Sequence, residues 1–135
     1  MASKEDFKEK KVLLADDSST ARQIIKRELI QMGFDDQNIR DAADGDQALK
    51  FLSKTGFDMI ISDWHMPNMD GLNFFKAIRN GSILRKIPFL LVTVETEKNN
   101  VMKAMKAGID QYIVKPINPD ELQSRILQLF EGVEY

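Results

Sequence analysis

Short apolar segments alternate with helix-like segments five times along this chain. The apolar segments are Val12–Ala15, Ile39–Ala43, Met59–Ser62, Phe89–Val94 and Tyr112–Val114. After each of them, apolar residues recur every three or four positions, which is typical of an amphipathic helix. The alternation predicts an α/β domain in which helices cover both faces of a parallel sheet. A TIM barrel would need eight strand–helix units and many more residues.

The expected helices contain Ala21–Met32, Ala48–Leu52, Leu72–Ile78, Val101–Met105 and Leu122–Phe130. The last one has the clearest start, because Asn118 is a good N-cap and Pro119 suits the first helical position. Among the five segments, Ile39–Ala43 has the most polar residues, which fits a strand at the edge of the sheet. With right-handed crossovers, this favours a flavodoxin-like, doubly wound five-stranded parallel sheet of order 2-1-3-4-5 with five helices.

A chain of 135 residues has the size of one compact domain. Residues 4–11 are almost all charged, so we expect residues 1–11 to form a solvated N-terminal arm. We expect the folded domain over residues 12–131 and a short tail at 132–135. Only five residues follow Phe130, so we expect the chain to act by docking and not through an output domain.

Composition excludes several classes of function. A net charge of -2 with 30% charged residues gives no basic surface for nucleic acid. The sequence has no apolar stretch long enough to span a bilayer and no secretory signal at its N-terminus, so we expect a cytoplasmic protein without membrane attachment. Cysteine is absent and His65 is the only histidine, which excludes disulfides and multi-histidine zinc sites within one chain. Any metal should therefore be a hard ion bound by oxygen.

Polar residues stand at the carboxyl ends of four expected strands, where sheets of this class hold their sites. They are Asp16 and Asp17 after the first strand, Asp63 after the third, Thr93 in the fourth, and Lys115 with Pro116 after the fifth. Taken singly, each has an ordinary explanation, such as a helix cap or a solvated strand end. Together they predict one shallow pocket containing three carboxylates, one hydroxyl and one ammonium group.

This set of groups suits phosphoryl transfer. Two carboxylates about 5 Å apart repel by roughly 3 kcal/mol at an effective dielectric constant near 20, so three of them need a cation. Mg²⁺ is expected, because it binds a few carboxylates together with waters and a phosphate oxygen. One aspartate can then attack phosphorus to form an acyl phosphate, while Lys115 and Thr93 interact with the phosphoryl oxygens.

These residues resemble the receiver domains of two-component systems, and most closely the single-domain chemotaxis regulators. The resemblance covers Val12 to about Phe130, and its most specific part is Ile60–Gly71, with the sequence IISDWHMPNMDG. It implies that Asp63 is the phosphoryl acceptor, with a histidine kinase as donor. A further candidate partner is a phosphatase.

The resemblance also implies a metal site and a switch. Asp17 would bind Mg²⁺ directly, Asp16 would bind it through water, and His65 would contribute its backbone carbonyl. The bond between Lys115 and Pro116 is expected to be cis. In the family, the hydroxyl at the position of Thr93 moves toward the phosphorylated aspartate, and the aromatic residue at the position of Tyr112 turns inward.

Two positions depart from the family pattern. His65 replaces a common asparagine, and Val94 replaces a common alanine or glycine. We hypothesise that Val94 narrows access to Asp63 and slows phosphoryl exchange. A second hypothesis is that the His65 imidazole biases the attacking water, so that phosphate loss depends on pH near neutrality.

The resemblance implies a readout face on the fourth helix, fifth strand and fifth helix. Lys98, Lys103 and Lys106 surround the expected position of Tyr112 and favour an acidic partner peptide, and a flagellar motor switch protein is the implied partner. We expect a monomer.

Three other functions stay open at this point. A stand-alone phosphorelay carrier would use the same chemistry and pass the phosphoryl group rapidly from Asp63 to a histidine phosphotransfer domain. A flavin electron carrier is disfavoured, because Asp16 and Asp17 would repel the flavin phosphate. A phosphohydrolase of the haloacid dehalogenase type would need two aspartates separated by one residue in the first strand, and this sequence lacks them.

Overall fold

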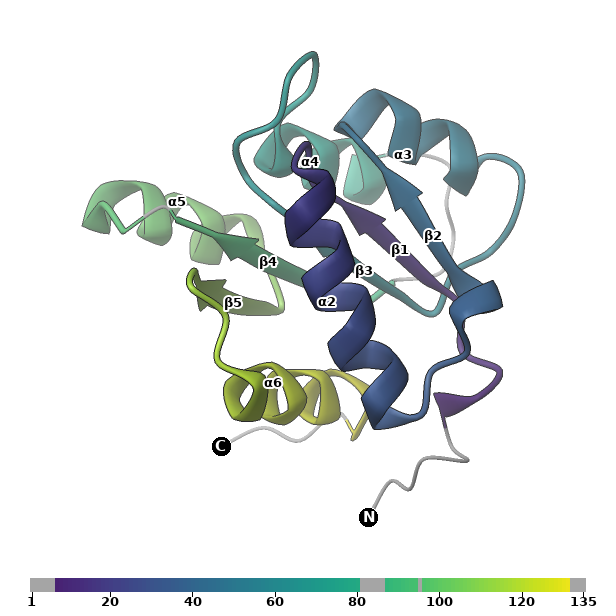
Figure 1. Cartoon of the computed structure of the whole chain (residues 1–135). Coiled ribbons are helices and arrows are strands. Elements are labelled where there is room, and N and C mark those ends of the chain that lie inside the picture. The colour runs from purple at the N-terminus through teal and green to yellow at the C-terminus, as the bar shows by residue number, and fades with distance from the viewer. Residues whose placement is uncertain (1–6, 81–86, 95, 132–135) are drawn as a thin grey trace.

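The computed structural model describes residues 7–80, 87–94 and 96–131, and it contains one five-stranded parallel sheet (Figure 1). Its strands are β1 (Val12–Ala15), β2 (Ile39–Ala42), β3 (Met59–Ser62), β4 (Phe89–Thr93) and β5 (Gln111–Val114). They lie in the order β2-β1-β3-β4-β5, which confirms the predicted order. Strand β2 is at one edge, in agreement with its more polar sequence.

Five α-helices cover the sheet in the described part of the chain. They are α2 (Ser19–Met32), α3 (Gly45–Leu52), α4 (Gly71–Asn80), α5 (Lys98–Ala107) and α6 (Pro119–Glu131), and a short 3-10 helix, η1, spans Asp36–Asn38. Helices α2 and α6 pack on one face of the sheet, and α3, α4 and α5 pack on the other (Figure 1). This arrangement confirms the doubly wound fold.

The central strands are apolar throughout because both of their faces are buried. Val12 and Leu14 of β1 contact the core under α2 and α6, whereas Leu13 and Ala15 contact the core under the other three helices. Successive side chains of a strand point to opposite faces, so a sheet covered on both sides needs apolar residues at every position. The continuous apolar pattern thus reports the two-sided burial directly.

The helix ends follow the signals in the sequence. The Asn118 Oδ1 atom accepts hydrogen bonds from the backbone N–H groups of Asp120 and Glu121, at 2.9 and 3.2 Å. Gly33 and Gly108 end α2 and α5 with φ angles of 114° and 101°, in the left-handed region that glycine adopts without strain. Asn118 thus begins α6 at the carboxyl edge of the sheet, whereas Gly33 and Gly108 end their helices at the opposite edge, ahead of β2 and β5.

The N-terminal boundary differs from the expected one. Phe7 is buried, with its ring stacked on Phe34 at a centroid distance of 4.7 Å and tilted against Phe130 at 5.6 Å. Phe7 therefore packs on the domain, although the sequence led us to expect a solvated arm over residues 1–11. The Phe7 ring and a hydrogen bond from Asn38 Nδ2 to the Lys8 carbonyl, 3.1 Å long, help to hold a segment in which Lys8 and Glu9 stay exposed. Residues 1–6 and the expected tail at 132–135 lie outside the described residues.

None of the helices in the described ranges combines the length and the apolar character that a membrane crossing requires.

Candidate functional site

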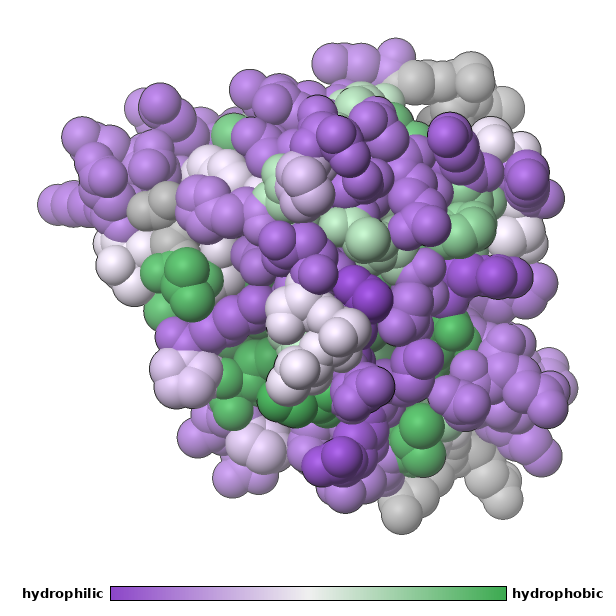
Figure 2. All heavy atoms as spheres, turned by 45° about the horizontal axis from the view of Figure 1, so that its top comes forward, coloured by the Kyte–Doolittle hydropathy of each residue, from purple (hydrophilic) through white to green (hydrophobic). Residues whose placement is uncertain are grey.

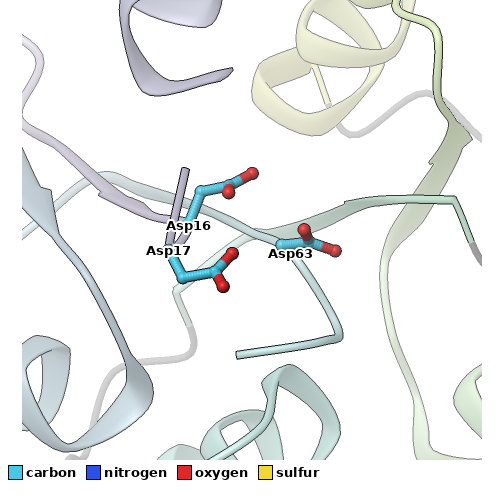
Figure 3. A group of neighbouring side chains, drawn as sticks. All are labelled: Asp16, Asp17 and Asp63. Atoms are coloured by element: carbon cyan, nitrogen blue, oxygen red, sulfur yellow. The ribbon is translucent and has the colours of Figure 1, made fainter. Parts of the chain in front are cut away.

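Three carboxylates meet at the carboxyl edge of the sheet. Asp16 and Asp17 follow β1 and Asp63 follows β3, and these two strands are direct neighbours in the sheet. One carboxylate oxygen from each residue lies within 4.8 Å of the others, and Figure 3 shows the three side chains next to one another. Asp16 and Asp63 are buried, whereas Asp17 is exposed. The predicted convergence of these three residues is present in the structure.

Lys115 reaches this cluster from β5, two strands away from β3. Its Nζ atom lies 2.8 Å from Asp16 Oδ2 and 3.1 Å from Asp63 Oδ2. Three carboxylates and one ammonium group, -3 and +1, leave a formal charge of -2 in the pocket. That charge suits one divalent cation. The peptide bond between Lys115 and Pro116 is cis, as the resemblance implied.

The titration of Lys115 reflects these contacts. Partial burial lowers the pKa of its ammonium group, but the hydrogen bonds and charges of Asp16 and Asp63 act in the opposite direction and outweigh it. The net result is a pKa raised above the ordinary value of 10.5. Lys115 therefore carries a full positive charge at any physiological pH.

The backbone around Asp63 orients its carboxylate. The Asp63 Oδ1 atom accepts a hydrogen bond of 2.6 Å from the Trp64 N–H group, and the Asp63 N–H group donates to the Ala15 carbonyl at 2.9 Å. The Gly71 N–H group closes the loop by donating to the Trp64 carbonyl at 2.7 Å. A Cβ atom on Gly71 would lie 2.1 Å from the Asp63 carbonyl oxygen, so only glycine allows this close approach.

The loop after β1 is organised by Ser18. The Ser18 N–H group donates to Asp16 Oδ1 at 2.9 Å, and the Ser18 hydroxyl oxygen accepts from the Ala21 N–H group at 3.2 Å, which caps helix α2. The Asp16 carboxylate thus has one oxygen on a backbone donor and the other on Lys115. These two contacts fix the direction of the carboxylate.

The other predicted residues lie around this cluster. Thr93 is buried at the end of β4, beside Val114 of β5 in the strand register, and its carbonyl accepts from the Lys115 N–H group at 2.9 Å. Tyr112 is half-buried on β5. His65 is exposed, with its ring stacked near that of Trp64 at a centroid distance of 6.1 Å.

Sequence reasoning did not identify Arg22 and Asp41 as part of this region. An Arg22 guanidinium N–H group donates to the Asp16 carbonyl, and its Nε atom lies 3.2 Å from Asp41 Oδ2. The only sequence signals were an arginine five residues after the acidic pair and a charged residue within β2.

The sequence model that describes the response regulator receiver domain matches residues 12–127. The chain belongs to this family. Among curated proteins, the receiver is 39% identical to the chemotaxis protein CheY of Pseudomonas aeruginosa, covering 91% of this chain and 98% of that protein. It is also 39% identical to the chemotaxis protein CheY-3 of Vibrio cholerae, covering 92% of this chain and 94% of that protein.

Solved structures agree with this assignment. The chemotaxis response regulator CheY4 of Vibrio cholerae superposes with a TM-score of 0.79 at 37% identity, covering 89% of this chain and 98% of that one. The signal receiver domain of a histidine kinase from Syntrophus aciditrophicus gives a TM-score of 0.82 at 32% identity, covering 93% and 92%. This receiver is thus of the CheY type, which is consistent with two-component signalling.

A pocket of about 580 Å³ lies beside the predicted readout face of the receiver. Its lining residues are Val101, Met105, Asp110, Gln111, Tyr112, Val114, Glu121 and Arg125, from α5, α6, β5 and the segment before β5. Lys98, Lys103 and Lys106 are exposed on the same helix α5, although none of them lines the pocket. In Figure 2, hydrophilic atoms cover the outer end of α5 at the left, and hydrophobic side chains gather beside them.

Proposed function

We propose that this receiver accepts a phosphoryl group on Asp63 from a histidine kinase in a Mg²⁺-dependent reaction, and that phosphorylation changes its affinity for a partner in chemotaxis. The observation that carries this proposal is the cluster of three aspartates with Lys115 at the carboxyl edge of the sheet. Membership of the receiver family and the similarity to proteins named CheY support the signalling role.

The donor set fits Mg²⁺. Hard carboxylate oxygens are the protein ligands that this ion prefers, and the cluster offers three of them with one side open to water and substrate. Asp17 and Asp63 would hold the ion directly, Asp16 would hold it through water, and His65 would add its backbone carbonyl. When bound, the ion would offset the negative charge of the cluster and of the incoming phosphoryl oxygens.

The chain's own residues then account for the transfer. A carboxylate oxygen of Asp63 forms a bond to phosphorus as the bond from phosphorus to the donor's histidine nitrogen breaks, giving an aspartyl phosphate. Lys115 already lies against Asp63, so its ammonium group can follow the charge onto the phosphoryl oxygens. The Thr93 hydroxyl would donate a hydrogen bond to one of these oxygens.

The same contacts provide a switch. Movement of Thr93 toward the phosphoryl group would free space into which the Tyr112 ring turns, and Tyr112 lines the pocket between α5 and α6. Shifting a population from about 1:99 to 99:1 needs roughly 5.5 kcal/mol, which several charge-assisted hydrogen bonds can supply. The pocket would then differ between the two states, and so would its affinity for a partner.

Removal of the metal tests the proposal. After incubation with acetyl phosphate and Mg²⁺, we expect the intact protein to gain the mass of one phosphoryl group, and we expect no gain when a chelator removes the metal. Short incubation times and acid quenching guard against loss by rapid hydrolysis. An adduct of equal amount without metal would contradict the proposed role of the three carboxylates.

The exposed lysines of α5 test the readout face. We propose that they attract an acidic peptide of a flagellar motor switch protein, and we expect Lys98→Glu with Lys106→Glu to weaken binding at least tenfold at low salt, because opposite charges become like charges. Titration of the phosphorylated double variant against the motor protein measures this. Unchanged affinity would show that the partner docks elsewhere, and unchanged phosphorylation of Asp63 is the internal control.

Val94 controls access in our proposal. It follows Thr93 directly, just past the end of β4, and its branched side chain is 63% exposed. We expect Val94→Ala to raise the rates of phosphorylation and dephosphorylation several-fold, since a smaller side chain admits the donor and water more easily. Time courses with acetyl phosphate measure both rates, and two unchanged rates would reject the idea.

His65 tests a pH effect on phosphate loss. Its exposed ring follows the acceptor by two positions, and histidine side chains change charge between about pH 5 and pH 8. We expect dephosphorylation to speed up several-fold as pH rises through this range, because only a neutral imidazole can accept a proton from water. The variant His65→Asn should lose this dependence, and matching pH profiles for the two proteins would remove the hypothesis.

A further inference from the structure

Arg22 links the acidic loop to the edge strand of the sheet. It lies in the first turns of α2, and its side chain turns back toward the end of β1. One guanidinium N–H group donates to the backbone carbonyl of Asp16, and the Nε atom lies 3.2 Å from Asp41 Oδ2 on β2. The Arg22 side chain is only 17% exposed, so these two contacts are partly shielded from water.

The contacts of Arg22 complete a set of bonds that immobilise Asp16. The Asp16 N–H group donates to the Ala42 carbonyl of β2 at 3.0 Å. The Asp16 carboxylate is held by the Ser18 N–H group and by Lys115. Arg22 holds the carbonyl, the one remaining polar group of this residue. Every polar group of Asp16 thus has a hydrogen-bond partner, from β2, from the start of α2 or from Lys115.

The orientation of the Asp16 carbonyl determines where Asp17 lies. The two residues share one planar peptide group, so rotation of that carbonyl also swings the Cα atom of Asp17. Asp17 is the exposed member of the carboxylate cluster, and its side chain has the most freedom to leave the site. A guanidinium group can hold the carbonyl and Asp41 together, because its donors form a rigid planar fork.

We propose that Arg22 is a positioning residue of the metal centre: through the Asp16 carbonyl it holds Asp17 where it can bind Mg²⁺, and Asp41 anchors Arg22 in turn. This inference rests on the proposed function, because it assumes that the three aspartates bind the ion. Arg22 itself touches neither the ion nor the phosphoryl group.

Loss of a positioning residue weakens Mg²⁺ binding, whereas loss of the Arg22 charge alone would have the opposite effect. A nearby cation repels Mg²⁺, so removing the charge of Arg22 without any effect on geometry would tighten metal binding. Lys26 provides the matched control, since its Nζ atom lies 2.9 Å from the other oxygen of the same Asp41 side chain. Lys26 and Arg22 are comparably shielded, at 28% and 17% exposure, and our proposal needs no contact between Lys26 and Asp16. The direction of the change therefore separates positioning from simple electrostatics.

The experiment is a Mg²⁺ titration of the full chain without any phosphoryl donor. The signal is the fluorescence of Trp64, the only tryptophan, whose N–H group is bonded to Asp63, and calorimetry provides a second readout. We expect Arg22→Met to weaken Mg²⁺ binding about tenfold or more, as is usual when a residue supporting a metal ligand is lost. Lys26→Met should stay within about twofold of the wild type or bind slightly tighter. Arg22→Lys should fall between, because it keeps the charge and loses the fork.

If Arg22→Met binds Mg²⁺ as tightly as the wild type or more tightly, the inference is overturned. It is also overturned if Arg22→Met and Lys26→Met weaken Mg²⁺ binding to the same extent. Thermal unfolding without Mg²⁺ shows whether each variant is folded. If Arg22→Met is not folded, Arg22→Lys replaces it in the test. Wild-type Mg²⁺ affinity in Arg22→Lys would then contradict the proposal. If the wild type shows no saturable Mg²⁺ signal, the proposed metal site is overturned, and this inference with it. The same holds if the wild-type signal is still present in Asp17→Asn. If the wild type gives a saturable signal that Asp17→Asn removes, the metal site stands and the Arg22 variants alone decide the role of Arg22.

Discussion

Replacing Asp63 by Asn abolishes the phosphoryl adduct that we expect the wild-type chain to form with acetyl phosphate and Mg²⁺. Asparagine has nearly the shape of aspartate, and its Oδ1 atom can still accept the hydrogen bond from the Trp64 N–H group. Its amide is not a nucleophile of comparable strength, so no acyl phosphate can form. We expect complete loss of the adduct by intact-protein mass spectrometry, not a reduction in its rate.

The control for this variant makes the same chemical change outside the cluster. Asp46 is exposed in the first turn of α3, so Asp46→Asn should keep a wild-type adduct. The neutral side chain of Asp63→Asn also loses the ion pair with Lys115, and thermal unfolding must show that the variant is folded at the assay temperature. A remaining adduct in folded Asp63→Asn would identify a different acceptor and contradict the proposed role.

The fold could be predicted because it depends on repeated local patterns. Each central strand is buried on both faces, so a run such as Met59–Ser62 identifies a strand. Cap residues such as Asn118 mark the start of a helix. The meeting of Asp16, Asp17 and Asp63 followed from strand order, because parallel neighbours bring their carboxyl ends to one edge. These inferences need no knowledge of individual side-chain contacts.

The remaining features depend on contacts between single side chains far apart in the sequence. Phe7 packs on Phe34 and Phe130, although the charged residues around it indicated a solvated segment. Arg22 meets Asp16 and Asp41 because helix α2 turns back over the end of β1, and no periodicity records that direction. Composition averages over such contacts, so the site could be placed from the sequence but its supporting bonds could not.

Replacing Lys115 by Met destabilises the metal-free protein by roughly 2 kcal/mol. Loss of one partner from a fully buried ion pair typically costs about 3–5 kcal/mol. Lys115 is 18% exposed, so water can take over part of its role and the expected value is lower. Asp16 and Asp63 would lose their shared cation while remaining buried beside each other. Urea unfolding of the two proteins with a chelator present measures the difference in free energy.

The dependence on pH has a definite sign. The pKa of Lys115 is raised in the folded protein, so its contribution to stability is fully present below the ordinary value of 10.5 and is lost as the pH rises through the raised value. The stability difference between wild type and Lys115→Met should therefore stay constant from neutral pH to about pH 10 and shrink at higher pH. A difference that disappears already between pH 7 and pH 9 would contradict the assigned pairing.

Addition of Mg²⁺ provides the sharpest form of this test. In Lys115→Met the three carboxylates keep their formal charge of -3, whereas in the wild type the Lys115 ammonium group, +1, offsets part of it. The divalent ion should therefore bind the variant more tightly. We expect saturating Mg²⁺ to raise the melting temperature of the variant more than that of the wild type, and to recover most of the lost stability. Lys54→Met, at an exposed position after α3, is the control and should respond as the wild type does. If Mg²⁺ stabilises Lys115→Met no more than the wild type, the ammonium group and the metal do not share the same three carboxylates, and the proposed arrangement of the site is wrong.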